Sequence, residues 1–355
     1  MIHGVFQFSP AVSGGAVHFR IEDFRHISVG TGLHNKKKEP YFMKNQYVNR
    51  LQEGDRINDY FVAARKDLRS KQDGGKFLGM VLKDKTGDIG GVMWNNAPET
   101  AKLFEVGDVV GIRGVVCVYQ GRLQVRIEQV FPLNESDYSI SDLVNKPENL
   151  TDIADKFDQI IRSLGNPFCK ALCISFWDDE KFKESFSQAM AGKKWHHEYV
   201  GGLVHHCYEM ARIAEIMCEL YPELDRDVLL AAIFLHDVGK VYEMTHGLAA
   251  DYTTEGKLLG HLQIGCTMVQ RKIDGIPDFP EKLRLELLHC ILSHHGELVN
   301  GSPVTPRTIE AIVLHHIDNL DAQTAAFSRI IRETREKGQE WSEYLPLIDR
   351  VIWTK

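Results

Sequence analysis

Residues 228–235 form an uninterrupted apolar run, and His236 and Asp237 follow it directly. A run of this length predicts a buried helix. A buried helix that ends on an imidazole and a carboxylate must give both groups a partner, because unpaired polar groups are costly to bury. A divalent metal ion would be a suitable partner, since transition metals accept nitrogen and oxygen ligands together. A lone His-Asp pair is more often a packed core histidine, so the interpretation depends on further ligands.

Further candidate ligands are present in the same part of the chain. Twelve of the sixteen histidines lie between His196 and His316. The ordered set predicts a metal centre built from the following residues: His206, His236, Asp237, His261, His294, His295 and Asp318. One ion would be held by His206, His236, Asp237 and Asp318, while Asp237 bridges to a second ion. His261 would hold that second ion together with either His294 or His295.

A pair of metal ions predicts chemistry on a phosphate. Two ions a few Å apart stabilise the attacking and leaving oxygens of a phosphoryl displacement and lower the pKa of a bridging water. We therefore treat His236 and Asp237 as candidate catalytic residues. Lys240 is a third candidate, because it lies one turn beyond Asp237 if the helix continues. Its ammonium could then neutralise charge on a non-bridging phosphate oxygen.

The chain of 355 residues is long enough for two domains. Residues 1–47 do not reveal their fold and are treated as an N-terminal extension. Residues 48–133 show short alternating strands with frequent turn signals. The expected strands cover residues 56–64, 77–84, 89–94, 109–119 and 122–127, with a short helix within 98–104. Five strands with a helix between the third and the fourth predict an OB-fold barrel.

An OB-fold binds single strands by stacking bases on aromatic side chains along a basic groove. The candidate nucleic-acid-binding residues are Phe61, Phe77, Trp94, Tyr119 and Arg122. Each aromatic residue could equally belong to the barrel core. The charge is uneven, since residues 1–133 carry 19 Lys and Arg against 14 Asp and Glu, whereas the rest carries 23 against 35. A basic N-terminal part favours contact with a polyanion, and an acidic C-terminal part suits metal binding.

Residues 134–152 are polar and are interpreted as a linker. Residues 153–355 have helical periodicity throughout, so the expected fold is a β-barrel domain followed by an all-α domain. Long helices are expected after Gly202 to about Leu220, from Gly260, over 282–292, and from Thr308 to about Glu336. No stretch has the apolar length of a membrane span, and the N-terminus lacks the pattern of a secretory signal. The seven cysteines include no Cys-x-x-Cys pair, which favours a reducing, cytoplasmic location.

The order His206, His236-Asp237 and Asp318 resembles the H…HD…D signature of the HD metal-dependent phosphohydrolases. The chain is similar in particular to the bacterial YhaM-type 3′→5′ exoribonucleases, which join an OB-fold to an HD domain. The resemblance covers roughly residues 50–350, but not the N-terminal extension. It rests on the segments 84–87, 119–124, 201–206, 235–240, 252–256, 259–261, 291–296, 301–303 and 318–322.

The resemblance implies an enzyme that uses divalent metal ions, with Mn²⁺ as the expected metal and Mg²⁺, Co²⁺ or Fe²⁺ as alternatives. The implied reaction releases nucleoside 5′-monophosphates from the 3′ end of single-stranded RNA, with single-stranded DNA as a second substrate. It also implies a homo-oligomer, and the lack of a long apolar stretch predicts no membrane partner. One alternative is an HD-domain nucleotide or cyclic-nucleotide phosphohydrolase, although an OB-fold argues against a purely small-molecule substrate. Another is a non-catalytic regulator that binds single strands, although the complete set of candidate ligands argues against a silent site.

Overall fold

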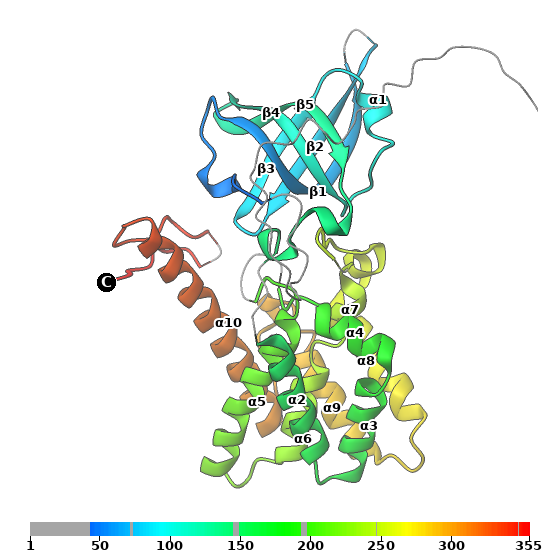
Figure 1. Cartoon of the computed structure of the whole chain (residues 1–355). Coiled ribbons are helices and arrows are strands. Elements are labelled where there is room, and N and C mark those ends of the chain that lie inside the picture. Colours follow the sequence, from blue (N-terminus) through cyan, green and yellow to red (C-terminus); the bar gives the residue numbers. More distant parts are fainter. Residues whose placement is uncertain (1–42, 72–73, 145–148, 193–196, 246, 347) are drawn as a thin grey trace, which may run out of the picture. The chain divides into compact units, whose positions relative to one another are not determined.

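The computed structural model describes residues 43–71, 74–144, 149–192, 197–245, 247–346 and 348–355. Most of the predicted N-terminal extension, including the triple lysine at 36–38, lies outside these residues. A 3₁₀ helix, η2 (Val48–Arg50), precedes the barrel. The strands are β1 (Arg56–Ser70), β2 (Lys76–Asp84), β3 (Gly87–Met93), β4 (Val109–Tyr119) and β5 (Arg122–Pro132), with α1 (Ala97–Thr100) between β3 and β4. They form a closed barrel in the order β1-β2-β3-β5-β4, in which only the β3–β5 pair is parallel (Figure 1). The predicted five-strand barrel with an intervening helix is confirmed.

Two strands are longer than predicted because polar residues continue the ladders. Strand β1 runs on to Ser70, since Arg65 to Ser70 pair with β2 after a bulge between Ala63 and Arg65. Strand β5 extends to Pro132 and pairs with β4 over its whole length. Alternation of polar and apolar residues predicts only the half-buried part of a strand. Strand residues that are exposed on both faces of the sheet show no alternation and are therefore not predicted.

The barrel core corrects one predicted binding residue. Phe61 is completely buried and packs in the barrel core with Leu78, Leu82 and Ile112. The ammonium of Lys44 lies 3.6 Å from the centre of its ring. Phe61 therefore cannot offer a face to a base, and the prediction that it stacks on nucleic acid is wrong. Its period-2 position in β1 points inward, where barrel packing needs a large side chain.

The segment predicted as a linker is partly structured. It contains two 3₁₀ helices, η3 (Glu135–Asp137) and η4 (Ile140–Asp142). Asp142 accepts hydrogen bonds of 2.7 Å from the hydroxyls of Tyr47 and Tyr60, and Leu143 is fully buried. The beginning of this segment is thus attached to the barrel, and its end passes into the first long helix.

The C-terminal domain is helical, as predicted. Its helices are α2 (Leu150–Ser163), α3 (Pro167–Trp177), α4 (Glu180–Gln188), α5 (Gly202–Leu220), α6 (Arg226–Leu235), α7 (Lys240–Glu243), α8 (Thr254–Asp274), α9 (Glu281–Ser293) and α10 (Ile309–Glu336), with the 3₁₀ helix η5 (Leu298–Asn300) between α9 and α10. Within the described residues from 149 onward, extended pairing is limited to isolated bridges such as Met244–Tyr252. Among the same described parts of the chain, no helix has the length and apolar character needed to cross a bilayer.

Helix α6 is the centre of the helical core. Asp225 caps it by accepting hydrogen bonds from the amides of Asp227 and Val228, and every residue from Val228 to Leu235 is buried. The ring of Phe234 packs against a shell of aromatic rings at centroid distances of 5.3–6.4 Å, formed by Phe157, Phe176, Trp177, Phe182 and Phe186. This packing holds the C-terminal end of α6, where His236 and Asp237 follow, in a fixed place.

Candidate metal centre

Five helices deliver the predicted ligands to one place. His206 comes from α5, His236 caps the C-terminus of α6, and Asp237 follows it. The remaining ligands are His261 on α8, His294 and His295 at the end of α9, and Asp318 on α10. Groups of ligand atoms within 4.8 Å of one another link this set: His206 with His236 and Asp318; His236 with Asp237 and His294; and His261 with His294 and His295. The structure therefore brings all seven residues together.

Two glycines explain how α8 reaches the end of α6. A Cβ atom on Gly239 would lie 2.1 Å from the carbonyl oxygen of His261 and 2.7 Å from the amide nitrogen of Gly265. The backbone after Asp237 can therefore touch α8 only because residue 239 has no side chain. Gly260 has a φ of 71° and breaks α8 immediately before His261. The expected start of a helix at Gly260 corresponds to this kink within a longer helical segment.

The first subsite consists of His206, His236, Asp237 and Asp318. The Nε2 atom of His206 lies 3.2 Å from Oδ1 of Asp318, and Nε2 of His236 lies 3.1 Å from Oδ2 of Asp237. His206 and His236 are completely buried, whereas the side chain of Asp318 is 17% exposed. This subsite contains two carboxylates and two imidazoles.

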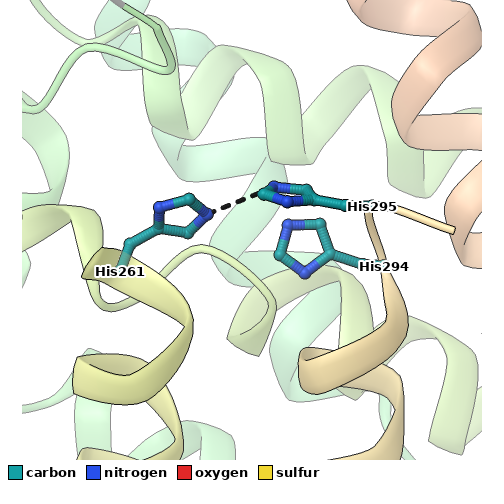
Figure 2. Close-up of side chains that lie close together, drawn as sticks. All are labelled: His261, His294 and His295. Atoms are coloured by element: carbon teal, nitrogen blue, oxygen red, sulfur yellow. Dashed lines mark hydrogen bonds between the residues drawn. The ribbon is translucent and has the colours of Figure 1, made fainter. Parts of the chain in front are cut away.

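The second subsite consists of Asp237, His261, His294 and His295. The Nε2 atoms of His261 and His295 face each other at 3.3 Å, with His294 beside them (Figure 2). Oδ1 of Asp237 lies 3.6 Å from Nε2 of His261 and 3.8 Å from Nε2 of His294. Asp237 thus faces both subsites, and both His294 and His295 belong to the cluster.

The donor set fits a metal ion. The Nδ1 atoms of His236 and His294 lie 2.7 and 2.8 Å from backbone carbonyls, which can only accept hydrogen bonds. Nδ1 of each ring therefore donates to its carbonyl, and Nε2 is the ring nitrogen that faces the cluster. Nε2 of His236 and Oδ1 of Asp237 are buried and have no hydrogen-bond partner among the described residues. Buried acceptors without a donor are unfavourable, and a shared cation satisfies them.

The electrostatics of the cluster favour the same interpretation. Burial alone would raise the pKa of Asp237, but His236 and Lys240 outweigh it and hold the pKa well below its ordinary value. Burial also opposes ionisation of Asp318, yet its contact with His206 lowers its pKa strongly. The pKa of His294 is lowered by burial and by the neighbouring His236. The cluster thus holds ionised carboxylates and a neutral imidazole, which are the ligand forms that a metal requires.

His206 is in the opposite situation. Burial disfavours its imidazolium, but hydrogen bonds and charges from Asp318 and Asp321 prevail and raise its pKa to about 9. Without a metal ion, His206 is therefore protonated at neutral pH. The first subsite thus holds a proton on His206 when no metal ion is bound, and its two carboxylates favour a metal ion in place of that proton.

Lys240 lies where it can stabilise Asp237. The chain leaves α6 after Leu235 and re-enters a helix at Lys240, so the helix does not continue from Asp237 to Lys240 without a break. The ammonium nevertheless lies 2.6 Å from Oδ2 of Asp237 and donates to the carbonyl of Ala191. Its charge is engaged within the protein, so a contact with a phosphate oxygen remains a proposal.

Two carboxylates that the sequence analysis did not select support the ligands from behind. Asp321 accepts a hydrogen bond from Nδ1 of His206 at 2.6 Å and faces Nε2 of His197 at 2.9 Å. Glu243 contacts Nδ1 of His261 at 3.0 Å. Asp321 follows Asp318 by three residues on a helix, a spacing that could have identified it. Glu243 and His197 have no such local signal.

The barrel exposes three of the other predicted binding residues. Trp94 and Tyr119 are 49% and 61% exposed, and Arg122 is exposed at the start of β5. The half-buried Phe77 packs against Trp94, with ring centres 4.9 Å apart. The ammonium of Lys71 lies 5.5 Å from the centre of the Trp94 ring. An exposed indole with a supporting ring and a nearby cation can stack with a base.

Comparison with known families agrees with this architecture. Residues 203–323 match the HD domain family, and residues 62–133 match a family described as an OB-fold nucleic acid binding domain. An HD domain indicates a metal-dependent phosphohydrolase, and here the segment that matches it follows the segment that matches the OB-fold family. The combination supports a nucleic acid phosphohydrolase.

Solved structures that resemble the chain include the second OB-fold domain of replication protein A from Methanococcus maripaludis. That match has 23% identity and a TM-score of 0.21, and covers 26% of this chain and 97% of the other. A putative aspartyl-tRNA synthetase from Leishmania major Friedlin matches with 14% identity and a TM-score of 0.21, over 44% of this chain and 37% of the other. Asparaginyl-tRNA synthetase from Pyrococcus horikoshii matches with 11% identity and a TM-score of 0.22, over 69% and 63%. The chain thus spans less than two thirds of these synthetases.

Proposed function

We propose that this chain is a metal-dependent 3′→5′ exonuclease that hydrolyses single-stranded RNA, and also single-stranded DNA, to nucleoside 5′-monophosphates. The observation that carries the proposal is the buried cluster of ionised carboxylates and Nε2 atoms on the same chain as an OB-fold with exposed aromatic rings. The direction of attack and the preference for RNA come from the resemblance in sequence.

The residues would divide the work as follows. The first and second subsites would each hold one divalent ion, and Asp237 would be their shared ligand because its two oxygens face both. Such a pair of ions supplies an activated water and neutralises the charge that develops on the phosphate. Lys240 holds the carboxylate of Asp237 in place through the 2.6 Å ion pair. The partly exposed side chains of His261 and Asp318 mark the side from which a substrate can approach.

The ligand types favour manganese over magnesium. The second subsite offers three imidazoles and one carboxylate. Mg²⁺ prefers oxygen ligands and retains its water, whereas Mn²⁺, Fe²⁺ and Co²⁺ accept imidazole more readily. The donor set thus argues against Mg²⁺, and the resemblance in sequence implies Mn²⁺, so we propose two Mn²⁺ ions with Co²⁺ or Fe²⁺ as functional replacements.

The barrel would hold the single strand. Stacking on Trp94, with Tyr119 and Arg122 as further contacts, would retain a long substrate while its end reaches the metal centre. A dinucleotide would depend on the metal centre alone.

The test is incubation of the manganese-loaded chain with 5′-labelled single-stranded RNA, with Asp237→Asn as the control. We expect a ladder that shortens from the 3′ end, release of 5′-monophosphates, no requirement for inorganic phosphate, and resistance of duplexed ends. Immediate release of the label as a mononucleotide would show attack from the 5′ end and refute the proposed polarity. Hydrolysis of mononucleotides or cyclic nucleotides alone would favour a small-molecule phosphohydrolase, and tight binding without cleavage would favour a regulator.

A further inference from the structure

The histidines of the metal centre differ in what supports the ring nitrogen that faces away from the cluster. For His236 and His294, the partner of Nδ1 is a backbone carbonyl three residues earlier in the chain. For His206 and His261, it is a carboxylate from elsewhere, Asp321 and Glu243 respectively. Nδ1 of His295 is buried and has no hydrogen-bond partner among the described residues. One charged supporting group therefore stands behind each of the two subsites.

Asp321 is built into its position. Its side chain is only 6% exposed, and the same oxygen that accepts from His206 lies 2.9 Å from Nε2 of His197. The 2.6 Å contact with Nδ1 of His206 has the length of a charge-assisted hydrogen bond. Asp321 approaches the edge of the ring opposite to Nε2, which faces Asp318. It therefore supports His206 and does not compete for the ion that Nε2 would bind.

Glu243 has the corresponding place behind the second subsite. Its side chain is 11% exposed, and Oε1 contacts both Nδ1 and the backbone amide of His261 at 3.0 and 3.1 Å. The backbone of Glu243 is held in turn by Thr253, whose amide donates to its carbonyl at 2.9 Å. This arrangement fixes both the ring and the main chain of His261 at the kink of α8.

A carboxylate at Nδ1 does two things to a ligating imidazole. It selects the tautomer that leaves the Nε2 lone pair available, and it increases the electron density that Nε2 donates. A carboxylate is more effective than a carbonyl in the second respect because it carries a full charge in a buried setting. The metal affinity of His206 and His261 should therefore depend on these carboxylates. His236 and His294 have a backbone carbonyl at Nδ1, which a substitution does not remove.

We propose that Asp321 and Glu243 are positioning residues that set the metal affinities of the two subsites separately, Asp321 through His206 and Glu243 through His261. The inference rests on the proposed two-metal function and adds two residues that lie outside the H…HD…D signature. Each subsite can then be weakened without the other.

The test is calorimetric titration of the metal-free full-length chain with Mn²⁺. The variants are Asp321→Asn, Glu243→Gln and, as a matched control, Glu336→Gln, which removes an exposed carboxylate from the same helix as Asp321. We expect two ions to bind the unchanged chain and the control alike. Each of the other variants should weaken one ion by about 10- to 100-fold and leave the other within about threefold.

Further variants identify which ion is affected. The Asp321→Asn titration should resemble that of His206→Ala, and the Glu243→Gln titration that of His261→Ala. At one equivalent of Mn²⁺, electron paramagnetic resonance should show isolated ions in both carboxylate variants. A purely structural role would not confine the loss to one ion. If either variant weakens both ions equally, or neither, the inference is wrong.

Two further outcomes are possible: the Asp321→Asn variant does not fold, or the unchanged chain binds fewer than two ions. If Asp321→Asn does not fold, as judged by circular dichroism, Asp321→Glu keeps the charge but displaces it. That variant should weaken the same single ion, and unchanged binding of both ions would overturn the inference. If the unchanged chain binds fewer than two Mn²⁺ ions, the proposed two-metal function itself fails, and the inference fails with it.

Discussion

The raised pKa of His206 predicts how metal binding depends on pH. An ion in the first subsite needs the Nε2 lone pair of His206, so its binding must displace a proton from a group whose pKa is about 9. Asp237 and Asp318 have lowered pKa values and are already ionised, and His294 and His295 have lowered pKa values and are already neutral. Metal binding at this subsite should therefore release one proton at neutral pH.

The magnitude follows from that single proton. Below a pKa of about 9, the apparent affinity for a metal changes about tenfold per pH unit, and the effect levels off near the pKa. Between pH 7.0 and pH 8.5 the dissociation constant of the first ion should fall about 25-fold. The assay is anaerobic calorimetry with Mn²⁺ in two buffers of different ionisation enthalpy, which also counts the released protons. No proton release at pH 7, or release of two protons by this ion, would refute the reasoning.

The stability of the metal-free protein should depend on pH in the opposite direction: metal affinity increases with pH, whereas the free energy of unfolding should decrease. The pKa of His206 is higher in the folded state than the ordinary value of about 6.5, so protonation stabilises the fold at low pH. That contribution is fully present below about pH 6.5 and is lost as the pH rises through about 9. In the presence of a chelator, the contribution of His206 to the free energy of unfolding should thus decrease by about 2 kcal/mol from pH 7.0 to pH 8.5. Urea unfolding of the chain and of His206→Gln, in which the effect should be absent, measures it.

Three further substitutions test separate parts of the proposal. Asp237→Asn removes the charge shared by both subsites, so turnover should fall by at least about 100-fold and bound manganese should decrease, as measured by kinetics and metal analysis; near-normal turnover with full metal content would rule out the shared ligand. Trp94→Ala should raise KM on long RNA about 5- to 150-fold while dinucleotide cleavage is unchanged, because stacking contributes about 1–3 kcal/mol per base. Trp341→Ala removes a similarly exposed indole from the C-terminal segment and should have no such effect; equal losses in both variants would contradict a binding role of Trp94. Phe61→Ala should lower the free energy of unfolding by about 3–5 kcal/mol because it empties the barrel core; a loss of RNA affinity at unchanged stability would restore Phe61 as a contact.

Much of the fold could be predicted because its periodicities are regular. Strand β4 was predicted with the bounds that the structure has, since its apolar residues and flanking turns define both ends. The apolar run of α6 was equally clear, because a helix surrounded by aromatic rings carries no polar face. The polar end of β1 was missed, since its residues pair through their backbone and leave no pattern of burial.

The ligands of the centre could be predicted from the type and order of their side chains, whereas the supporting carboxylates could not. A histidine next to an aspartate at the end of a buried helix is weak evidence by itself, but together with the ordered set of further histidines and Asp318 it indicates a metal centre. Glu243 is an ordinary residue by comparison, and it acquires its role because Gly239 and Gly256 allow α8 to approach the backbone that follows Asp237. The inward position of Phe61 was overlooked for a related reason, since an aromatic residue in a strand can point to either face.

The role of Asp321 could have been predicted from its spacing to Asp318. Asp318 and Asp321 are three residues apart on one face of α10, so both carboxylates lie close to the same histidine, His206. Two acids near one buried imidazole would repel each other unless a cation lies between them. In the metal-free chain that cation is the proton of His206, which accounts for its raised pKa. A metal ion can replace the proton only at Nε2, because Asp321 continues to hold the proton at Nδ1. The same pair of carboxylates therefore explains why the first subsite is protonated when empty and why its metal affinity should increase with pH.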